Sequence, residues 1–209
     1  MKLTKYGHAC VVLEEQGKKL VIDPGVFTDD FGGLDGIVAV VVTHVHPDHF
    51  NPQHLDAIFA ANPDAKLFSV QEVAEQYAKA AAVHSGQQEA SGPFALRFSG
   101  EMHELIHDSL PRPHNTAVTV NDAFFYPGDS YTLPDAPVRV LAVPANAPWM
   151  KIADSIDYIA HVKPERCLPT HNGLLSEAGH TIYNGGLKRG ADAAGAEFVF
   201  LRPGESLDI

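Results

Sequence analysis

Apolar and polar residues alternate in short runs over the first part of the chain, a pattern typical of β-strands with one buried face. We expect strands at residues 2–6, 9–13 and 19–22, with a hairpin turn through Gly17 between the second and the third. Ile37–Val42 is apolar throughout and rich in β-branched residues. We therefore expect it to be a central strand that is buried on both faces.

A helix is expected after this first group of strands. Asn51 is a favoured N-cap and Pro52 a favoured first helical residue, and apolar residues recur at helical spacing over Pro52–Ala61. Apolar runs predict further strands at residues 66–70, 94–98, 116–120, 123–126, 138–143, 167–169 and 197–201. Helical spacing predicts helices at residues 71–82, at 151–161 and, interrupted by Gly185-Gly186, at 181–194. Strands and helices mix without a linker or repeat, so we expect a single domain, residues 1–209, of the α/β or α+β class.

The composition narrows the class of partner. The chain has 15 Lys and Arg against 26 Asp and Glu, a formal net charge of −11 at pH 7, and nucleic-acid-binding proteins usually carry a basic surface instead. The longest apolar run is too short to span a bilayer. We therefore expect a small-molecule substrate, with neither nucleic acid nor membrane as a partner. The distant cysteines Cys10 and Cys167 and the lack of an apolar leader lead us to expect a cytoplasmic protein. The oligomeric state is left open.

The candidate chemistry is concentrated in the histidines, of which the chain has 12. The segment Thr43-His44-Val45-His46-Pro47-Asp48-His49 follows the apolar strand directly. In an extended chain, His44 and His46 project from the same face and can share one metal ion. Asp48 and His49 come from the turn before the helix and can face a second ion. Imidazole and carboxylate ligands suit Zn²⁺, Mn²⁺ or Fe²⁺, whereas ions that prefer thiolates would require cysteine.

Three further polar groups follow the ends of expected strands. His103 comes after the strand at 94–98, Asp129 lies in Tyr126-Pro127-Gly128-Asp129-Ser130, and His171 lies in Leu168-Pro169-Thr170-His171-Asn172-Gly173. Because loops that leave one edge of a sheet build the sites of α/β proteins, these side chains are expected to join the histidine-rich loop. His107 and His114 are rivals for the place of His103.

Together these motifs resemble the metallo-β-lactamase superfamily, and in particular its small single-domain hydrolases similar to the ascorbate-phosphate lactonase type. The resemblance covers essentially the whole chain, including Tyr6-Gly7-His8-Ala9, Ile22-Asp23-Pro24 and the closing Leu201-Arg202-Pro203-Gly204-Glu205. It implies a four-layer αββα sandwich with the two sheets inside. It also implies a ligand set, in which His44, His46 and His103 hold one metal ion, Asp48, His49 and His171 hold a second, and Asp129 bridges both.

The resemblance predicts a metal-dependent hydrolase. Two divalent ions, Zn²⁺ in the first place and Mn²⁺ or Fe²⁺ as alternatives, would share a water and convert it to hydroxide near neutral pH. That hydroxide would cleave an ester, lactone or phosphodiester bond in a small molecule, and Asp48 would orient or deprotonate the water besides binding metal. Two other classes stay open, namely a di-iron redox protein on the same scaffold and a metal-binding module without catalysis.

Several residues near these motifs allow two interpretations. Asp23 is expected to orient a ligand rather than to bind metal itself. His8, Tyr131 and Trp149 either line the pocket or pack against their neighbours. Asn115 is either functional or a solvated loop residue.

Overall fold

The computed structural model describes residues 1–28 and 35–209, and its strands form two sheets of seven. The first sheet has the order β14-β1-β2-β3-β4-β5-β6, with β1 (Lys2–Lys5), β2 (Val11–Glu15), β3 (Lys18–Ile22), β4 (Ile37–Val42), β5 (Lys66–Ser69), β6 (Ala80–Ala82) and β14 (Ser206–Asp208). The second has the order β13-β12-β11-β10-β9-β8-β7, with β7 (Gln88–Ser91), β8 (Phe94–Ser99), β9 (Ala117–Val120), β10 (Phe124–Tyr126), β11 (Val140–Pro144), β12 (Arg166–Thr170) and β13 (Glu197–Phe198). The helices are α1 (Pro52–Ala61), α2 (Gln71–Gln76), α3 (Ile152–Val162) and α4 (Glu177–Ala194).

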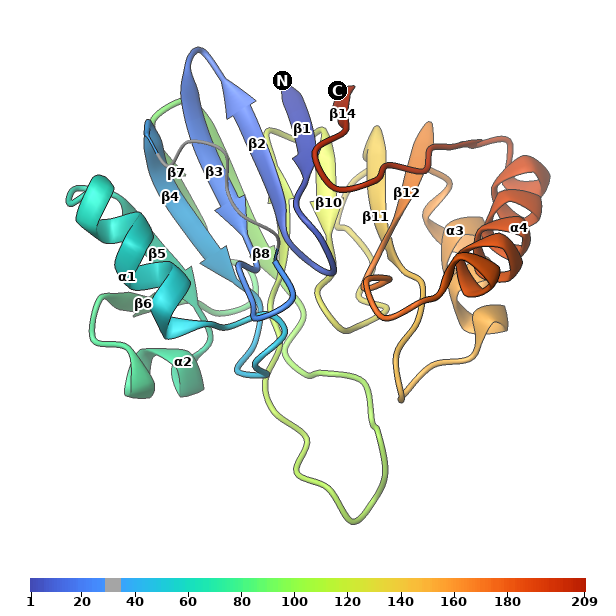
Figure 1. The fold of residues 1–209 in the computed structure, drawn as a ribbon, viewed down its shortest axis with the longest axis horizontal. Helices are drawn as coiled ribbons and strands as arrows, with labels where there is room; N and C mark the ends of the chain where they lie inside the picture. Colours follow the sequence, from blue (N-terminus) through green and yellow to red (C-terminus); the bar gives the residue numbers. More distant parts are fainter. Residues whose placement is uncertain (29–34) are drawn as a thin grey trace.

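The two sheets face each other, and helices cover their outer sides (Figure 1). The core between the sheets draws residues from both, such as Leu13 of β2 and Phe98 of β8. Leu55 of α1 packs in a second apolar cluster with residues of the first sheet. Ile159 of α3 and Leu187 of α4 belong to a third cluster with residues of the second sheet. The expected four-layer αββα sandwich is confirmed.

The local signals for turns and caps are also confirmed. Both residues of Gln16-Gly17, between β2 and β3, have positive φ, and so do both residues of Asn121-Asp122, between β9 and β10, as tight hairpin turns require. The side chain of Asn51 accepts a hydrogen bond from the backbone N–H of Gln53 at the start of α1. Ile37–Val42 is β4, which lies between β3 and β5 with its residues almost entirely buried.

Two expected helices differ in the structure. The helix expected over residues 71–82 ends at Gln76, and Ala80–Ala82 instead forms β6, which pairs in parallel with β5. Pairing at the edge of the sheet therefore overrides the helical propensity of the alanines. The helix expected over 181–194 begins earlier, at Glu177, and continues through Gly185-Gly186. A Cβ on Gly186 would lie 3.3 Å from Ile152 Cγ1, so this glycine allows α4 to pack closely on α3.

The remaining expected elements are present with shifted ends. The strand expected over residues 197–201 is shorter and is reduced to β13. Two strands, β7 and β14, were not expected, because they lie at or near the edges of their sheets and have polar sequences. No described helix has the length and apolar character needed to cross a membrane.

The parallel strands direct the candidate residues to one edge of the sandwich. β4 runs parallel to β3 and β5, and β11 runs parallel to β10 and β12. The loops after β4, β10 and β12 meet at the lower edge in Figure 1, where the long connection of residues 100–116 between β8 and β9 also extends. Residues far apart in sequence therefore converge at this edge.

Candidate metal centre

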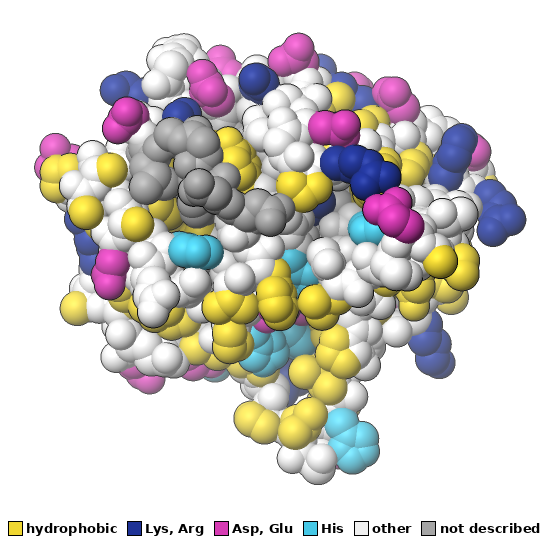
Figure 2. All heavy atoms as spheres, viewed as in Figure 1, with side chains coloured by type: hydrophobic (Ala, Val, Ile, Leu, Met, Phe, Trp, Pro, Cys, Tyr) yellow, Lys and Arg dark blue, Asp and Glu magenta, His cyan; other side chains and the backbone are white. Residues whose placement is uncertain are grey.

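The structure brings together all of the residues that the sequence nominates as ligands. Among the described residues, three groups of ligand atoms form where the loops meet. Within each group, all of the ligand atoms lie within 4.8 Å of one another. The first group is His44, His46 and His103, and the second is Asp48, His49 and His171 together with His8. The third, His44, His49 and Asp129, joins these two. Histidines are visible in the middle of the molecular face in Figure 2, with hydrophobic side chains around them.

The first group is built from the end of β4 and the connection that follows β8. His44 Nε2 and His46 Nδ1 lie 3.1 Å apart. The two side chains meet as expected, although residues 44–46 form a bend after β4 rather than an extended segment. The His103 ring lies 4.9 Å from that of His44 and 4.7 Å from that of His46, centroid to centroid. This arrangement presents three imidazole nitrogens to one point, which is sufficient for a metal ion with an open position.

The three histidines of the 100–116 connection differ in position. His103 is buried beside His44, whereas His107 and His114 are exposed. The Nδ1 of His107 bonds to the Ser109 hydroxyl, and His114 pairs with Glu72 at 2.6 Å. Among the three, only His103 lies at the centre.

The second group comes from the turn before α1 and from the end of β12. His171 Nε2 lies 3.2 Å from Asp48 Oδ2, and His49 Nε2 lies 3.8 Å from the same oxygen. His171 has a φ of 55°, a conformation that is uncommon outside glycine and is often found at functional sites. Its backbone is fixed there by a hydrogen bond from its N–H to the carbonyl of His8 at 2.9 Å.

Asp129 lies between the two groups. Its Oδ1 is 3.2 Å from His49 Nε2, and its Oδ2 is 3.3 Å from His103 Nε2 and 3.2 Å from His171 Nε2. Asp129 thus contacts ligands of both groups, and a carboxylate in this position can be shared by two cations. The position therefore agrees with the role that the family resemblance implies.

The tight turn before Asp129 depends on Gly128. Its φ is +64°, and a Cβ at this position would lie 2.3 Å from Asn115 Oδ1 and 2.8 Å from Thr43 Cβ. Asn115 is buried and supports the turn, since its Oδ1 accepts from the Asp129 N–H at 3.0 Å and its Nδ2 donates to the Pro127 carbonyl at 2.9 Å. Asn115 is therefore a structural part of the site rather than a solvated residue.

Asp23 orients His49 and holds the loop that carries the ligands. Its Oδ2 lies 2.6 Å from His49 Nδ1 and accepts from the Thr43 hydroxyl at 2.7 Å, while its Oδ1 accepts from the Thr43 N–H at 2.7 Å. Asp23 is fully buried. This contact supports the expected orienting role. Thr43 was not singled out in the sequence, since a threonine at a strand end carries no signal of such a contact.

Hydrogen bonds on the far side of the rings set the tautomers of the histidines. The Nδ1 of His171 lies 2.6 Å from the Asn146 carbonyl, and that of His103 lies 2.5 Å from the Glu104 carbonyl. A carbonyl can only accept, so each Nδ1 carries hydrogen, and Nε2 is the nitrogen that faces the centre and can bind a metal ion there. Among the described residues, the buried His49 Nε2, His103 Nε2 and Asp129 Oδ1 have no hydrogen-bond partner. These side chains fit a metal ion, whose coordination would satisfy such atoms.

The electrostatics of the cluster favour positive charge. Although burial opposes the effect, His49 and His171 hold the pKa of the Asp129 carboxyl well below its usual range. In return, Asp129 and Asp23 raise the pKa of His49 well above its usual value, again against burial. His44 behaves differently, because burial and the neighbouring His49 lower its pKa well below the usual value. The site can thus accept cations beside ionised carboxylates.

Trp149 and Tyr131 form one wall of the site. The Trp149 indole N–H donates to Asp129 Oδ2 at 2.9 Å, and its ring makes edge contacts with His103 at 6.0 Å and with Tyr131 at 5.3 Å. The Tyr131 hydroxyl bonds to Ser155 of α3 at 3.0 Å. Trp149 therefore contacts the polar centre directly, whereas Tyr131 connects it to the helix layer.

Comparison with known proteins agrees with this geometry. A family profile described as a beta-lactamase superfamily domain matches residues 2–171. The chain belongs to the metallo-β-lactamase superfamily. Protein Rv0786c of Mycobacterium tuberculosis is 36% identical over 193 residues, which cover 90% of this chain and 91% of the relative. The UPF0173 metal-dependent hydrolase NEQ378 of Nanoarchaeum equitans is 24% identical over 227 residues and covers 100% of both chains. A metal-dependent hydrolase from Parabacteroides distasonis shares the fold, with a TM-score of 0.78 at 17% identity over 96% of this chain and 92% of the other.

The superfamily assignment and the ligand cluster support one general activity. Relatives over nearly the whole chain are named metal-dependent hydrolases, and the chain has a buried group of histidines and carboxylates able to hold metal. It is a metal-dependent hydrolase of the metallo-β-lactamase superfamily. The ascorbate-phosphate lactonase type within the superfamily stays a prediction.

Proposed function

We propose that this hydrolase uses two divalent cations to cleave an ester, lactone or phosphodiester bond in a small molecule. The observation that carries the proposal is the position of Asp129 between two groups of ligand atoms. In this proposal His44, His46 and His103 hold one cation. Asp48, His49 and His171 hold the other, and Asp129 is shared.

The cations, when bound, would lower the pKa of a shared water toward neutrality and polarise the oxygen of the bond to be cleaved. Asp48 is proposed to orient the attacking water. Its side chain is 23% exposed, so it reaches both the ligand cluster and the solvent side. Against burial, His171 and His8 lower the pKa of the Asp48 carboxyl, which keeps it ionised and able to orient the attacking water. The Trp149 indole N–H donates to Asp129 Oδ2 and helps to hold this carboxylate in place.

The donor set favours Zn²⁺, with Mn²⁺ and Fe²⁺ as alternatives. It consists of imidazoles and carboxylates, which borderline and hard divalent ions prefer. Both cysteines are buried and free. Burial raises the pKa of Cys10 and raises that of Cys167 to about 12, so neither thiol is suited to act as a nucleophile. Two free thiols are also consistent with a reducing cytoplasm, which we propose as its location.

The surface around the site supports a small substrate with an apolar part. Leu105, Leu133 and Leu174 are exposed and lie within four residues of a proposed ligand in sequence. Val26 and Phe27 are also exposed, and they reach the site by contacts with Pro47 and with the His8 ring. Hydrophobic side chains are gathered around the histidines in Figure 2. An exposed apolar rim around a polar centre is typical of a ligand site. The net charge of −11 disfavours a nucleic-acid substrate, and we propose neither a nucleic acid nor a membrane as a partner.

Metal analysis combined with a hydrolysis panel tests the proposal. Metal content is measured by elemental analysis, with an absorption spectrum that separates coloured iron from colourless zinc. Turnover is measured on p-nitrophenyl acetate, a γ-lactone and bis-p-nitrophenyl phosphate. We expect close to two ions per chain and turnover of at least one compound. The variants His46→Ala and Asp129→Ala are expected to lose metal and turnover, whereas the exposed control His107→Ala keeps both. Turnover that survives metal loss, or two ions without turnover of any compound, would contradict it.

A further inference from the structure

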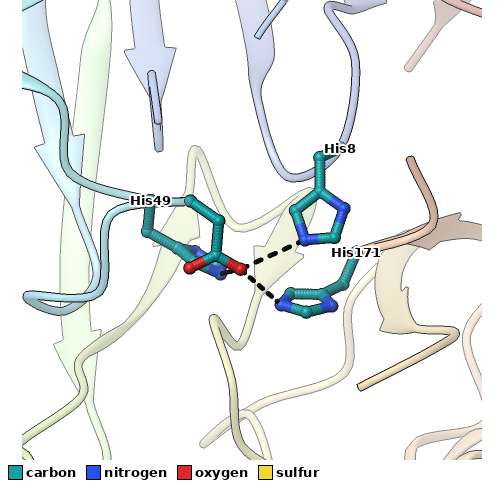
Figure 3. A group of neighbouring side chains, drawn as sticks. His8, His49 and His171 are labelled. Carbon is teal, nitrogen blue, oxygen red and sulfur yellow. Dashed lines mark ion pairs between the residues drawn. The ribbon is translucent and has the colours of Figure 1, made fainter. Parts of the chain in front are cut away.

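His8 is a buried histidine at the centre that the ligand set implied by the family resemblance does not include. It lies between β1 and β2, is 1% exposed, and its backbone carbonyl accepts from Lys5 Nζ and from the His171 N–H, each at 2.9 Å. Its ring lies 4.0 Å from the His171 ring, centroid to centroid. Figure 3 shows the His8 and His171 rings close to each other. The Nε2 of His8 lies 3.3 Å and that of His171 3.2 Å from Asp48 Oδ2.

The position of His8 permits two roles. Its Nε2 belongs to the same group of ligand atoms as Asp48, His49 and His171, so it could be a further ligand of the second cation. Alternatively, it could donate a proton to one of the ligands. The two roles require opposite tautomers, because a metal ligand needs a lone pair on Nε2 and a donor needs hydrogen there.

The hydrogen bond on the far side of the ring decides between the roles. The Gly173 backbone N–H donates to His8 Nδ1 at 3.1 Å. Because this nitrogen accepts, it cannot carry hydrogen, and the hydrogen of the ring is on Nε2. The rings of His103 and His171 show the opposite pattern, with Nδ1 facing a carbonyl. His8 is therefore oriented as a donor, whereas these neighbours are oriented as ligands.

The acceptor is identified by distance. Among the described residues, Asp48 is the carboxylate within 4 Å of His8, with Oδ2 3.3 Å from Nε2. This contact is long, and its alignment falls short of a hydrogen bond, since Nε2 counts among the buried atoms without a partner. Closing it requires a rotation of the Asp48 side chain, which is 23% exposed.

We propose that His8 is a positioning residue that donates a hydrogen bond from Nε2 to Asp48 and does not bind the second cation. It would hold Asp48 in the orientation in which this carboxylate serves both metal and substrate. The inference rests on the proposed two-cation function. It adds a residue whose tautomer is set by the loop after β12, since Gly173 follows His171 closely in sequence.

Two substitutions separate the donor role from the ligand role. In His8→Gln, the side-chain amide N–H₂ reaches the place of Nε2 and can still donate to Asp48. In His8→Asn, the shorter amide reaches only the place of Nδ1, so it keeps the contact with Gly173 and loses the donor. Both variants remove the imidazole, and His171→Ala serves as the comparison in which a proposed ligand is lost.

The main measurement is titration of the metal-free variants with Co²⁺, whose visible absorption reports the ligands around the ion. We expect His8→Asn to reach the wild-type stoichiometry and spectrum with about 10- to 100-fold weaker binding of the second ion, as for loss of a group that orients a ligand. We expect His8→Gln to bind within about threefold of wild type. His171→Ala is expected to change the spectrum and lose the second ion.

The outcomes distinguish this inference from the function on which it rests. If both His8 variants lose the second ion and change the spectrum, His8 is a ligand and the inference is wrong. If both bind like wild type, His8 merely packs, and the inference is equally wrong. If the wild-type chain binds fewer than two ions, the two-cation proposal fails instead. In the hydrolysis assay, a lower kcat with unchanged KM in His8→Asn, restored in His8→Gln, would give independent support.

Discussion

Asp23 Oδ2 lies 2.6 Å from His49 Nδ1, and both side chains are buried. The carboxylate accepts a hydrogen bond from Nδ1, so the Nε2 of His49 faces Asp129 and Asp48 and is the nitrogen that can bind a metal ion once its proton is displaced. The same oxygen accepts from the Thr43 hydroxyl at 2.7 Å. Asp23 thereby links the end of β3 to the ligand loop after β4, and the orientation of the second group depends on it.

Replacing Asp23 by Asn should weaken binding of the second cation. The amide keeps the size of the side chain but removes the charge that makes His49 a better ligand, and such losses typically reduce metal affinity about 10- to 100-fold. Competition with a chromogenic chelator measures the affinity. The matched control is Asp122→Asn, which removes an exposed carboxylate paired with Arg97 at 2.8 Å. Equal affinities for the two variants would show that Asp23 does not tune the site.

Replacing Gly25 by Ala should displace the ligand turn. A Cβ at Gly25 would lie 1.9 Å from the carbonyl oxygen of Asp48, so the backbone between Pro47 and His49 must shift. We expect a loss of about 1–3 kcal/mol of stability, as for overpacking, together with weaker metal binding. Urea denaturation measures the loss of stability.

The control for Gly25→Ala is another Gly→Ala change with free space around it. A Cβ at Gly185 would have nothing within 4 Å, and this residue lies inside α4. Gly185→Ala should stabilise the chain by about 0.5–1 kcal/mol, because alanine has the higher helix propensity. A Gly25→Ala variant as stable as wild type would contradict the close approach of the two loops.

The pH dependence of the metal-free chain should reflect His171. Against burial, Asp129 and Asp48 raise the pKa of His171 to about 9, above the ordinary value of about 6.5 for an unfolded chain. A histidine whose pKa is higher in the folded state stabilises the fold fully below about pH 6.5, and this contribution disappears as the pH rises through about 9. Its size is at most about 3 kcal/mol.

Urea denaturation in the presence of a chelator, at pH 6 and at pH 9.5, tests this sign. The metal-free wild type should be less stable at the higher pH. His171→Gln should reduce the difference, and His49, whose pKa is also raised, should account for part of what remains. Excess Zn²⁺ should reverse the trend, because metal replaces the proton and binds more tightly as the pH rises. A metal-free wild type that is more stable at pH 9.5 than at pH 6 would refute the assignment.

The sequence predicts those parts of the site whose geometry is local. His44 and His46 lie together because they are two residues apart in the short segment that directly follows β4. Asp129 and His171 could be placed because they directly follow strands that run parallel in the second sheet. The alternation of apolar and polar residues along the strands is also a local pattern, and it predicts which strand faces are buried between the layers of the sandwich.

Residues fixed by long-range contacts could not be predicted. The 100–116 connection turns back on itself through a bridge between Met102 and His114 and a hydrogen bond from Arg112 Nε to the His103 carbonyl at 2.5 Å. The family resemblance nominated His103, and these contacts, which no local pattern predicts, accompany the burial of His103 rather than of His107 or His114. The supporting role of Asn115 depends on its contact with Asp129, and the tautomer of His8 depends on Gly173, which is distant in sequence. β6 was missed because its pairing with β5 is not visible in an alanine-rich segment.

Trp149 should report metal binding by its fluorescence. It is the single tryptophan of the chain, and its indole N–H donates to Asp129 Oδ2 at 2.9 Å. A cation drawn to Asp129 reduces the electron density that this oxygen offers, so the indole emission should change as Zn²⁺ is added to the metal-free chain. The change should saturate with the stoichiometry found by elemental analysis and should be absent in Trp149→Phe. His107→Ala should titrate like wild type, whereas Asp129→Asn should respond weakly. An unchanged emission in a wild-type chain that binds Zn²⁺ would show that the cations do not engage Asp129, and the shared-carboxylate arrangement would then be wrong.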